Sequence, residues 1–258
     1  MVRLALLLSL SMLLMAGCET DQEESYCYPQ RITQTIPEGS ETTQVTADFN
    51  YEDNRLDHII WSNFQTHYFS YLEDGNLRSV AKKNVQTFRT RESVMVYDEG
   101  RVSRTNKYSI SLDRFTQENL DTTFTGYHLF TYEDGHIVLE EVYSNNEENT
   151  GADLAAYNMY TYDAVGNITR AVSLTARGGD TLSASSFTYD NKKHPFNGLE
   201  LPFEGESHIN NVHERTDLVS GDVYFHQVIY TPSDYPEQLN IKQESYLTEV
   251  IRIDYLCD

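Results

Sequence analysis

The sequence predicts an all-β protein: an antiparallel meander of about a dozen strands or more that closes, or nearly closes, into a barrel. A tyrosine-acid-glycine element recurs along the chain, and the segments between its copies alternate polar and apolar residues. Helix signals are nearly absent, the best being a stretch at 112–120 that suits only a short turn. Period-two alternation and regularly spaced turns together indicate strands joined by hairpins.

The repeated element begins with a tyrosine and ends at an aliphatic residue after a tight turn. Clear copies and two decayed ones begin at Tyr51, Tyr71, Tyr97, Tyr132, Tyr162, Tyr189 and Tyr230. Asp and Asn side chains cap free backbone N–H groups, and Gly accepts the positive φ of a bulged hairpin. We therefore expect the turn-forming residues to be Asp74, Gly75, Gly100, Asp134, Gly135, Asp163 and Gly166.

The segments that flank these turns are rich in β-branched and aromatic residues, as strands are. The tyrosine before each turn and the aliphatic residue after it are expected to meet across the hairpin, and such a pair stabilises by a few tenths to about 1 kcal/mol. Two like-charged pairs, Lys82-Lys83 and Glu140-Glu141, fall inside these segments. Because successive side chains of a strand point to opposite faces, each pair must place one member on each face.

The N-terminus has the features of a signal peptide. Residues 1–17 carry one charge, Arg3, followed by an apolar run too short to span a bilayer with normal flanks. The run ends in Leu14-Met-Ala-Gly-Cys18, which resembles a bacterial lipobox, with Met where Leu is commoner. That resemblance implies cleavage before Cys18 and acylation of this cysteine. An ordinary secretory signal is the alternative.

Residues 18–26 are expected to form an acidic tether between the lipid and a single β domain at 27–258. An acidic run directly after a lipidated cysteine also resembles the signals that carry some Gram-negative lipoproteins to the outer face of the outer membrane. We therefore expect an outer-membrane lipoprotein of a Gram-negative cell envelope, attached to the membrane only through its N-terminal lipid. Surface exposure and a plain solvated spacer both stay open.

Two cysteines remain once Cys18 is acylated: Cys27 and Cys257, one at each end of the predicted domain. An oxidising compartment and an even number predict one disulfide bridge between them, with two free buried thiols as the alternative. The formal net charge is −21, with 19 Lys and Arg against 40 Asp and Glu. This excludes nucleic-acid partners, because phosphate-backbone binding needs a basic surface.

Two family resemblances follow from these motifs. The copy Tyr160-Thr-Tyr-Asp-Ala-Val-Gly-Asn-Ile-Thr-Arg170 resembles the Tyr-Asp (YD) repeat of large secreted β-shell proteins, from which only the hairpin unit is carried over. The order of lipobox, acidic tether, spaced hairpins, Phe187–Phe196 and a terminal Tyr-Leu-Cys257 is similar to uncharacterised bacterial lipoprotein domains described as having a porin-like barrel fold. That resemblance covers about residues 27–258 and implies a fold but no catalytic residues.

The charges within the predicted strands bear on where the barrel lies. An outer-membrane barrel needs an unbroken apolar band facing lipid. The pairs Lys82-Lys83 and Glu140-Glu141 would each turn one ionised side chain toward that lipid. We therefore predict a soluble, porin-like barrel rather than one inserted in the membrane.

Motifs of catalysis and metal binding are missing from the sequence, which has no Gly-x-Ser-x-Gly, HExxH, P-loop or GxGxxG motif. His208 and His213 have acidic neighbours but match no zinc spacing, and their segment, 199–217, is typical of a polar loop. The acidic turns lack the register of a calcium-binding EF-hand. We therefore expect no metal and no cofactor.

Aromatic side chains supply the ligand-binding hypothesis. Trp61, Tyr160 and Tyr162 could stack against a sugar, although aromatic residues on strands more often belong to a core. We expect a non-catalytic binding or structural module of the cell envelope, whose partner is a glycan, a small apolar ligand or an envelope protein. A secreted polysaccharide hydrolase with paired carboxylates and an outer-membrane channel are the alternatives.

Overall fold

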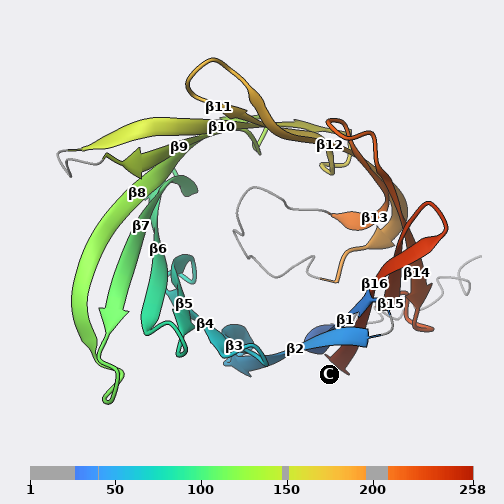
Figure 1. The fold of residues 1–258 in the computed structure, drawn as a ribbon, viewed down its shortest axis with the longest axis horizontal. Helices are drawn as coiled ribbons and strands as arrows, with labels where there is room; N and C mark the ends of the chain where they lie inside the picture. Colours follow the sequence, from blue (N-terminus) through green and yellow to red (C-terminus); the bar gives the residue numbers. More distant parts are fainter. Residues whose placement is uncertain (1–26, 40, 147–150, 196–208, 258) are drawn as a thin grey trace, which may run out of the picture.

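The computed structural model describes residues 27–39, 41–146, 151–195 and 209–257. This part of the chain is built of strands and turns, and its strands join in chain order into one closed antiparallel barrel in which β1 pairs with β16 (Figure 1). The predicted all-β barrel is therefore confirmed. The strands are β1 (Cys27–Glu38), β2 (Glu41–Glu52), β3 (Arg55–Trp61), β4 (Gln65–Tyr71), β5 (Leu77–Asn84), β6 (Arg89–Asp98), β7 (Arg101–Leu112), β8 (Asn119–Glu133), β9 (His136–Asn145), β10 (Ala152–Tyr162), β11 (Ile168–Thr175), β12 (Thr181–Lys193), β13 (Asn210–Asp217), β14 (Val223–Tyr230), β15 (Pro236–Gln243) and β16 (Tyr246–Cys257).

Several predictions concern residues outside those described. The signal peptide at 1–17, the tether at 18–26 and Cys18 belong to this group, as does His208. Among the described residues, no helix is long and apolar enough to cross a membrane.

Two local predictions are wrong. Within the expected polar loop at 199–217, residues 210–217 are strand β13, because their polar residues pair on both sides with β12 and β14. The copy that begins at Tyr189 forms no tight turn, because β12 continues through Lys193. Asp190 to Lys192 instead form an irregularity opposite Asn211, where extra residues bend the strand without ending it.

The clear copies of the repeat form turns at one end of the barrel. Asp134 and the glycines of these turns have positive φ, for example 94° at Gly75 and 95° at Gly166. Asp74 accepts a hydrogen bond from the Asn76 amide at 3.0 Å. The tyrosine before a turn pairs in register with the aliphatic residue after it in five hairpins: Tyr51 with Leu56, Tyr71 with Leu77, Tyr97 with Val102, Tyr132 with Ile137, and Tyr162 with Ile168.

The tyrosine hydroxyls connect each copy of the repeat to the one before it. Each hydroxyl donates to the backbone carbonyl of the aliphatic residue in the preceding copy, at 2.6–2.9 Å. The bonds run from Tyr71 to Leu56, Tyr97 to Leu77, Tyr132 to Val102, Tyr162 to Ile137 and Tyr189 to Ile168. We call the five tyrosines that donate these bonds the tyrosine rim. The rim ties neighbouring hairpins together and satisfies carbonyls at the strand ends.

Side-chain burial separates the two faces of the barrel wall. Five apolar side chains at alternating positions, Ala47, Phe49, Ile59, Phe69 and Val80, are at most 7% exposed. Five apolar side chains at the alternate positions, Ile60, Tyr68, Val96, Met159 and Ile229, are at least 40% exposed. A closed wall crowds side chains on its concave side and spreads them on its convex side. We therefore assign the buried set to the inward face.

The inward face of β2–β6 carries the main apolar cluster. Its buried members are Ala47, Phe49, Leu56, Ile59, Phe69, Leu77, Val80 and Met95. Tyrosines 71 and 97 of the rim pack against it. Apolar packing therefore stabilises this part of the wall from the inside.

A disulfide bridge closes the barrel seam. Cys27 and Cys257 lie directly opposite each other where β1 meets β16, and they are bonded. The predicted bridge is therefore confirmed. It joins residues separated by 230 positions in the sequence, so that the first and last strands of the barrel are linked covalently.

Candidate functional site

A buried carboxylate on β9 forms the centre of a polar cluster on the inward face. Glu140 is 2% exposed. It accepts hydrogen bonds from His128 Nδ1 at 2.6 Å, Asn158 Nδ2 at 2.8 Å and the Tyr160 hydroxyl at 3.0 Å. The donors come from β8 and β10, the two strands that pair with β9. Ladder pairing in this register brings the four side chains together.

The hydrogen bonds determine the charge of Glu140. Burial acts to raise the pKa of this carboxyl, but the hydrogen bonds from His128, Asn158 and Tyr160, with the charge of His128, outweigh burial and leave the pKa below its ordinary value. Glu140 is therefore ionised at neutral pH, with donors on both oxygens. This arrangement makes it a rigid anchor for its neighbours rather than a proton donor.

A cavity of about 310 Å³ lies beside this anchor. It lies over strands β8–β12, and most of its lining is polar. The lining residues are His128, Glu140, Asn158, Tyr160, Ala171, Val172, Ser173, Ser183 and Ser185. Ser173 pairs in register with both Asn158 and Ser183, which places an amide and two hydroxyls in one row across β10, β11 and β12.

The chemistry of the cavity suits a ligand rich in hydroxyl groups. An ionised carboxylate only accepts hydrogen bonds, so His128 Nδ1 carries a proton. Serine hydroxyls add groups that both donate and accept. The site therefore offers mixed donors and acceptors on a rigid strand scaffold.

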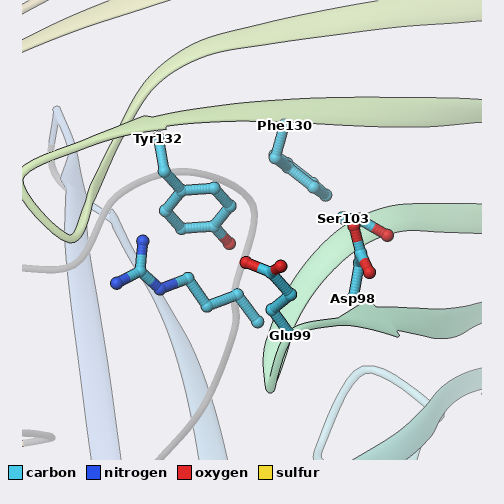
Figure 2. Close-up of a pocket in the computed structure, with 6 residues that line it drawn as sticks. Asp98, Glu99, Ser103, Phe130 and Tyr132 are labelled. Atoms are coloured by element: carbon cyan, nitrogen blue, oxygen red, sulfur yellow. The ribbon is translucent and has the colours of Figure 1, made fainter.

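A second hollow, of about 320 Å³, lies at the end of the barrel that carries the tyrosine rim (Figure 2). Phe130 and Tyr132 reach it from β8, and Asp98 and Glu99 reach it from the end of β6 and the turn that follows. Arg101 lies 5.6 Å from the Tyr132 ring centroid, in cation–π range. Because Tyr132 also donates to the Val102 carbonyl, this hollow is part of the structural frame.

Of the three aromatic residues predicted to stack against a ligand, Tyr160 and Tyr162 belong to one apolar cluster, and Trp61 belongs to another. Trp61 is on β3, packed against the apolar cluster and 5.8 Å from the His67 ring. Tyr162 donates to the Ile137 carbonyl and stacks on His136 at 4.6 Å. Tyr160 lines the cavity, but it is 7% exposed and its hydroxyl is engaged with Glu140.

Sequence reasoning did not identify Glu140 and His128 as site residues. The adjacent Glu140-Glu141 pair was the available signal, since one member had to point inward. Which partners would meet it depended on register, which the sequence pattern does not specify. Among the described residues, no group of three or more His, Cys, Asp or Glu side chains could hold a metal ion.

The fold is shared with known proteins. No protein-family model matches the chain, and no curated protein matches its sequence. A porin-like protein from Bacteroides uniformis has a similar structure, with a TM-score of 0.53 and 10% identity over 89% of this chain and 96% of that protein. A porin-like protein from Bacteroides vulgatus has a TM-score of 0.56 and 10% identity over 90% of this chain and 99% of that protein. At this identity the likeness concerns the fold alone.

Proposed function

We propose that this protein is a non-catalytic module of the cell envelope that binds a glycan on the inward face of its barrel. The observation that carries the proposal is the cavity beside Glu140, where an ionised carboxylate orients an imidazole, an amide and a phenol next to three serine hydroxyls. Glycans present dense hydroxyl groups that need such mixed donors and acceptors. A small apolar ligand would give the serine hydroxyls of the lining no hydrogen bond in place of those that they make with water, at a cost in affinity.

Binding fits this geometry better than hydrolysis does. Glycoside hydrolysis by paired carboxylates needs a second acid that keeps its proton near neutral pH. The cavity is lined by one carboxylate, Glu140, and its hydrogen bonds lower its pKa. Glu140 acts here as a positioning residue for His128, Asn158 and Tyr160.

The anchoring of this module is a further part of the proposal. Acylation of Cys18 would hold the barrel at the outer membrane of a Gram-negative cell through lipid alone. The porin-like proteins of similar fold come from Bacteroides, which suits an envelope location. Labelling cells with a radioactive fatty acid tests the anchor: wild type is expected to incorporate it and Cys18→Ala is not. Labelling of both proteins would contradict it.

The outward face supports a barrel surrounded by water. Arg31 and Asp48 form an ion pair at 2.5 Å across β1 and β2. Arg252 and Lys242 donate to glutamines on neighbouring strands. These residues alternate with the inward set, and charges at such positions are costly against lipid.

A channel remains the second candidate, because the barrel is closed and the similar structures are porin-like. Ion conductance in planar bilayers tests it. Sustained conductance by the purified full chain would favour the channel over the binding module.

A glycan array probed with the purified full chain tests glycan binding. We expect specific binding, with affinity lowered about tenfold by Glu140→Gln because His128 and Asn158 lose their charged acceptor. Glu141→Gln is the matched control, since it removes the same charge from the next residue, on the outward face. Failure to bind any glycan, or equal losses in the two variants, would contradict the proposal.

A further inference from the structure

The hollow of Figure 2, which we call the rim hollow, shares a row of inward residues with the cavity beside Glu140. Phe130 of β8 lines the rim hollow and pairs in register with Glu140 of β9. Side chains directly opposite each other on paired strands point to the same face, so Phe130 faces inward with Glu140. The row continues through residues that line the cavity: Asn158, Ser173 and Ser183. The rim hollow and the cavity therefore lie on either side of the Phe130–Glu140 pair.

The length of this row indicates the size of a ligand that would fill both spaces. Neighbouring strands lie about 4.8 Å apart, so the steps from β8 to β12 span roughly 19 Å along the wall. The rim hollow extends beyond β8, over the ends of β6 and β7. A single sugar ring is much shorter than this row, so only an oligosaccharide reaches both the rim hollow and the cavity.

Phe130 is an inward aromatic residue that lies outside both apolar clusters. Its side chain is half-buried. Among the described residues, no other aromatic ring stacks on it. Tyr160, by contrast, packs in one of these clusters and donates its hydroxyl to Glu140. A half-exposed ring in a hollow can bury the apolar C–H face of a sugar, because aromatic side chains supply a large flat apolar area at binding surfaces.

Polar groups face Phe130 across the rim hollow. In Figure 2 the lining side chains of the β6–β7 hairpin point toward the two rings of β8; they include Ser103, Asp98 and Glu99. Asp98 and Glu99 are exposed, and among the described residues no cation forms an ion pair with either carboxylate. Carboxylates accept short, charge-assisted hydrogen bonds from hydroxyl groups. A flat ring opposite such acceptors suits a sugar, whose ring has apolar C–H faces and an edge of hydroxyls.

The charge of the two linings favours a neutral ligand. Among the described lining residues there are three carboxylates, those of Asp98, Glu99 and Glu140, and one Arg or Lys side chain, that of Arg101. Arg101 lies over the ring of Tyr132, in cation–π range. The whole chain has a net charge of −21. Both the local and the overall charge would therefore repel acidic sugars.

We infer that the ligand is a neutral oligosaccharide that lies along this row, with one part in the cavity beside Glu140 and another stacked on Phe130 in the rim hollow. This inference rests on the proposed glycan-binding function and specifies the length and the charge of the glycan. Phe130 is the stacking residue, and Asp98 and Glu99 accept hydrogen bonds from the stacked sugar. Tyr132 belongs to the tyrosine rim, so the frame of the barrel fixes this wall of the rim hollow.

Titration calorimetry on the purified full chain tests this inference through the length of the ligand. The probes are maltooligosaccharides, cello-oligosaccharides and manno-oligosaccharides, each as disaccharide and hexasaccharide, with oligogalacturonate as the acidic comparison. We expect a neutral series to bind, and its hexasaccharide to bind about tenfold or more tightly than its disaccharide, because only the longer chain fills both the rim hollow and the cavity. Oligogalacturonate should bind more weakly than that hexasaccharide by a similar factor.

Substitution of Phe130 tests the stacking. Phe130→Ala is expected to remove the advantage of the hexasaccharide over the disaccharide, whereas Phe130→Tyr, which keeps a flat ring, should retain it. Phe124→Ala is the matched control, because it removes a half-buried ring from the same strand. Phe124 faces outward, since the residues paired in register across β7, β6 and β5 connect it to the exposed Tyr68. This control should change hexasaccharide affinity less than twofold.

Substitution of the two carboxylates tests the rim hollow without altering a packed side chain. D98N/E99Q is expected to weaken hexasaccharide binding about fivefold, because the stacked sugar loses charged acceptors. E52Q/E133Q is the matched control: it removes two exposed carboxylates at the same end of the barrel that do not line the rim hollow. This control should change affinity less than twofold.

The outcomes separate the two proposals. Equal affinity of wild type for disaccharide and hexasaccharide, or equal effects of Phe130→Ala and Phe124→Ala, would overturn the extended site and leave glycan binding beside Glu140 intact. Tighter binding of oligogalacturonate than of every neutral hexasaccharide would overturn the neutral ligand. Absence of binding by every probe, in calorimetry and on the glycan array, would overturn both proposals.

Discussion

The inward faces of β2–β6 and β8–β12 are built on the same hairpin repeat but differ in chemistry. The first carries the large apolar cluster, and the second carries a smaller one, formed by Tyr160, Ile168 and Phe187, beside a buried carboxylate. In β2–β6, buried Phe49, Leu56 and Phe69 fill the concave side. In β8–β12, the equivalent side bears Glu140, with its three donors, and opens into a polar cavity. The tyrosine rim connects the hairpins of both regions through the same hydroxyl-to-carbonyl bond. The repeat therefore builds a frame, and the inward residues are free to serve either packing or binding.

The largest expected effect on stability comes from removing a large buried side chain from the apolar cluster. Phe69→Ala removes a ring that is 5% exposed and should lower the free energy of unfolding by about 3–5 kcal/mol, because it leaves a cavity as well as losing apolar burial. Urea unfolding measures it. Tyr68→Ala, on the outward face and 46% exposed, is the control and should cost much less. Equal losses would contradict the assignment of faces.

Removing the disulfide bridge between β1 and β16 should have the next largest effect on stability. The double variant Cys27→Ala/Cys257→Ala is expected to lose about 2–4 kcal/mol, because the unfolded chain is no longer constrained. Thermal melting measures it, and a reducing agent should lower the melting temperature of wild type but not of the variant. Since the bridge belongs to the frame, glycan affinity at 25 °C should stay the same. A large drop in affinity would mean that the seam and the cavity are coupled.

Disrupting the polar cluster around Glu140 should lower the free energy of unfolding by somewhat less. Glu140→Gln is expected to lose about 1.5–3 kcal/mol, the range for hydrogen bonds to a charged group. Glu141→Gln should lose less than Glu140→Gln, because Glu141 is only half-buried on the outward face, where among the described residues it accepts a side-chain hydrogen bond from Tyr143 alone. Unfolding at neutral pH measures both, and similar losses would show that Glu140 is not the anchor of the cluster.

The pH dependence of stability tests the lowered pKa of Glu140. The folded-state pKa of Glu140 lies below its ordinary 4.5, so its contribution is present above pH 4.5 and is lost as the pH falls through the folded-state value. Wild type should lose more stability than Glu140→Gln over that acidic range. Parallel curves for the two proteins would contradict the lowered pKa.

The smallest effect on stability is expected from removing a single hydrogen bond of the tyrosine rim. Tyr162→Phe keeps the ring on His136 but removes the hydrogen bond to the Ile137 carbonyl, at a cost of about 1 kcal/mol. Burial, with the nearby Tyr132, raises the pKa of Tyr162 from 10.0 to about 12. Its contribution is therefore complete below pH 10 and lost as the pH rises toward 12. The free energy of unfolding of wild type should decline more steeply than that of Tyr162→Phe in that range.

The sequence alone determined the frame of this protein. Tyrosine-acid-glycine turns, alternating strands and two terminal cysteines predicted an antiparallel barrel with a bridge between Cys27 and Cys257, because turn chemistry and period-two patterning act over a few neighbouring residues. The same local rule showed that Glu140 and Glu141 point to opposite faces. It erred at β13, where polar residues alone suggested a loop, because pairing with strands on both sides overrides composition.

Only the tertiary structure decided what the barrel interior contains. The meeting of Glu140 with His128, Asn158 and Tyr160 depends on the register of three strands, and a shift by one residue would turn Glu140 outward. Turns form from local preferences, whereas a site on a barrel wall forms from residues that only ladder pairing brings together.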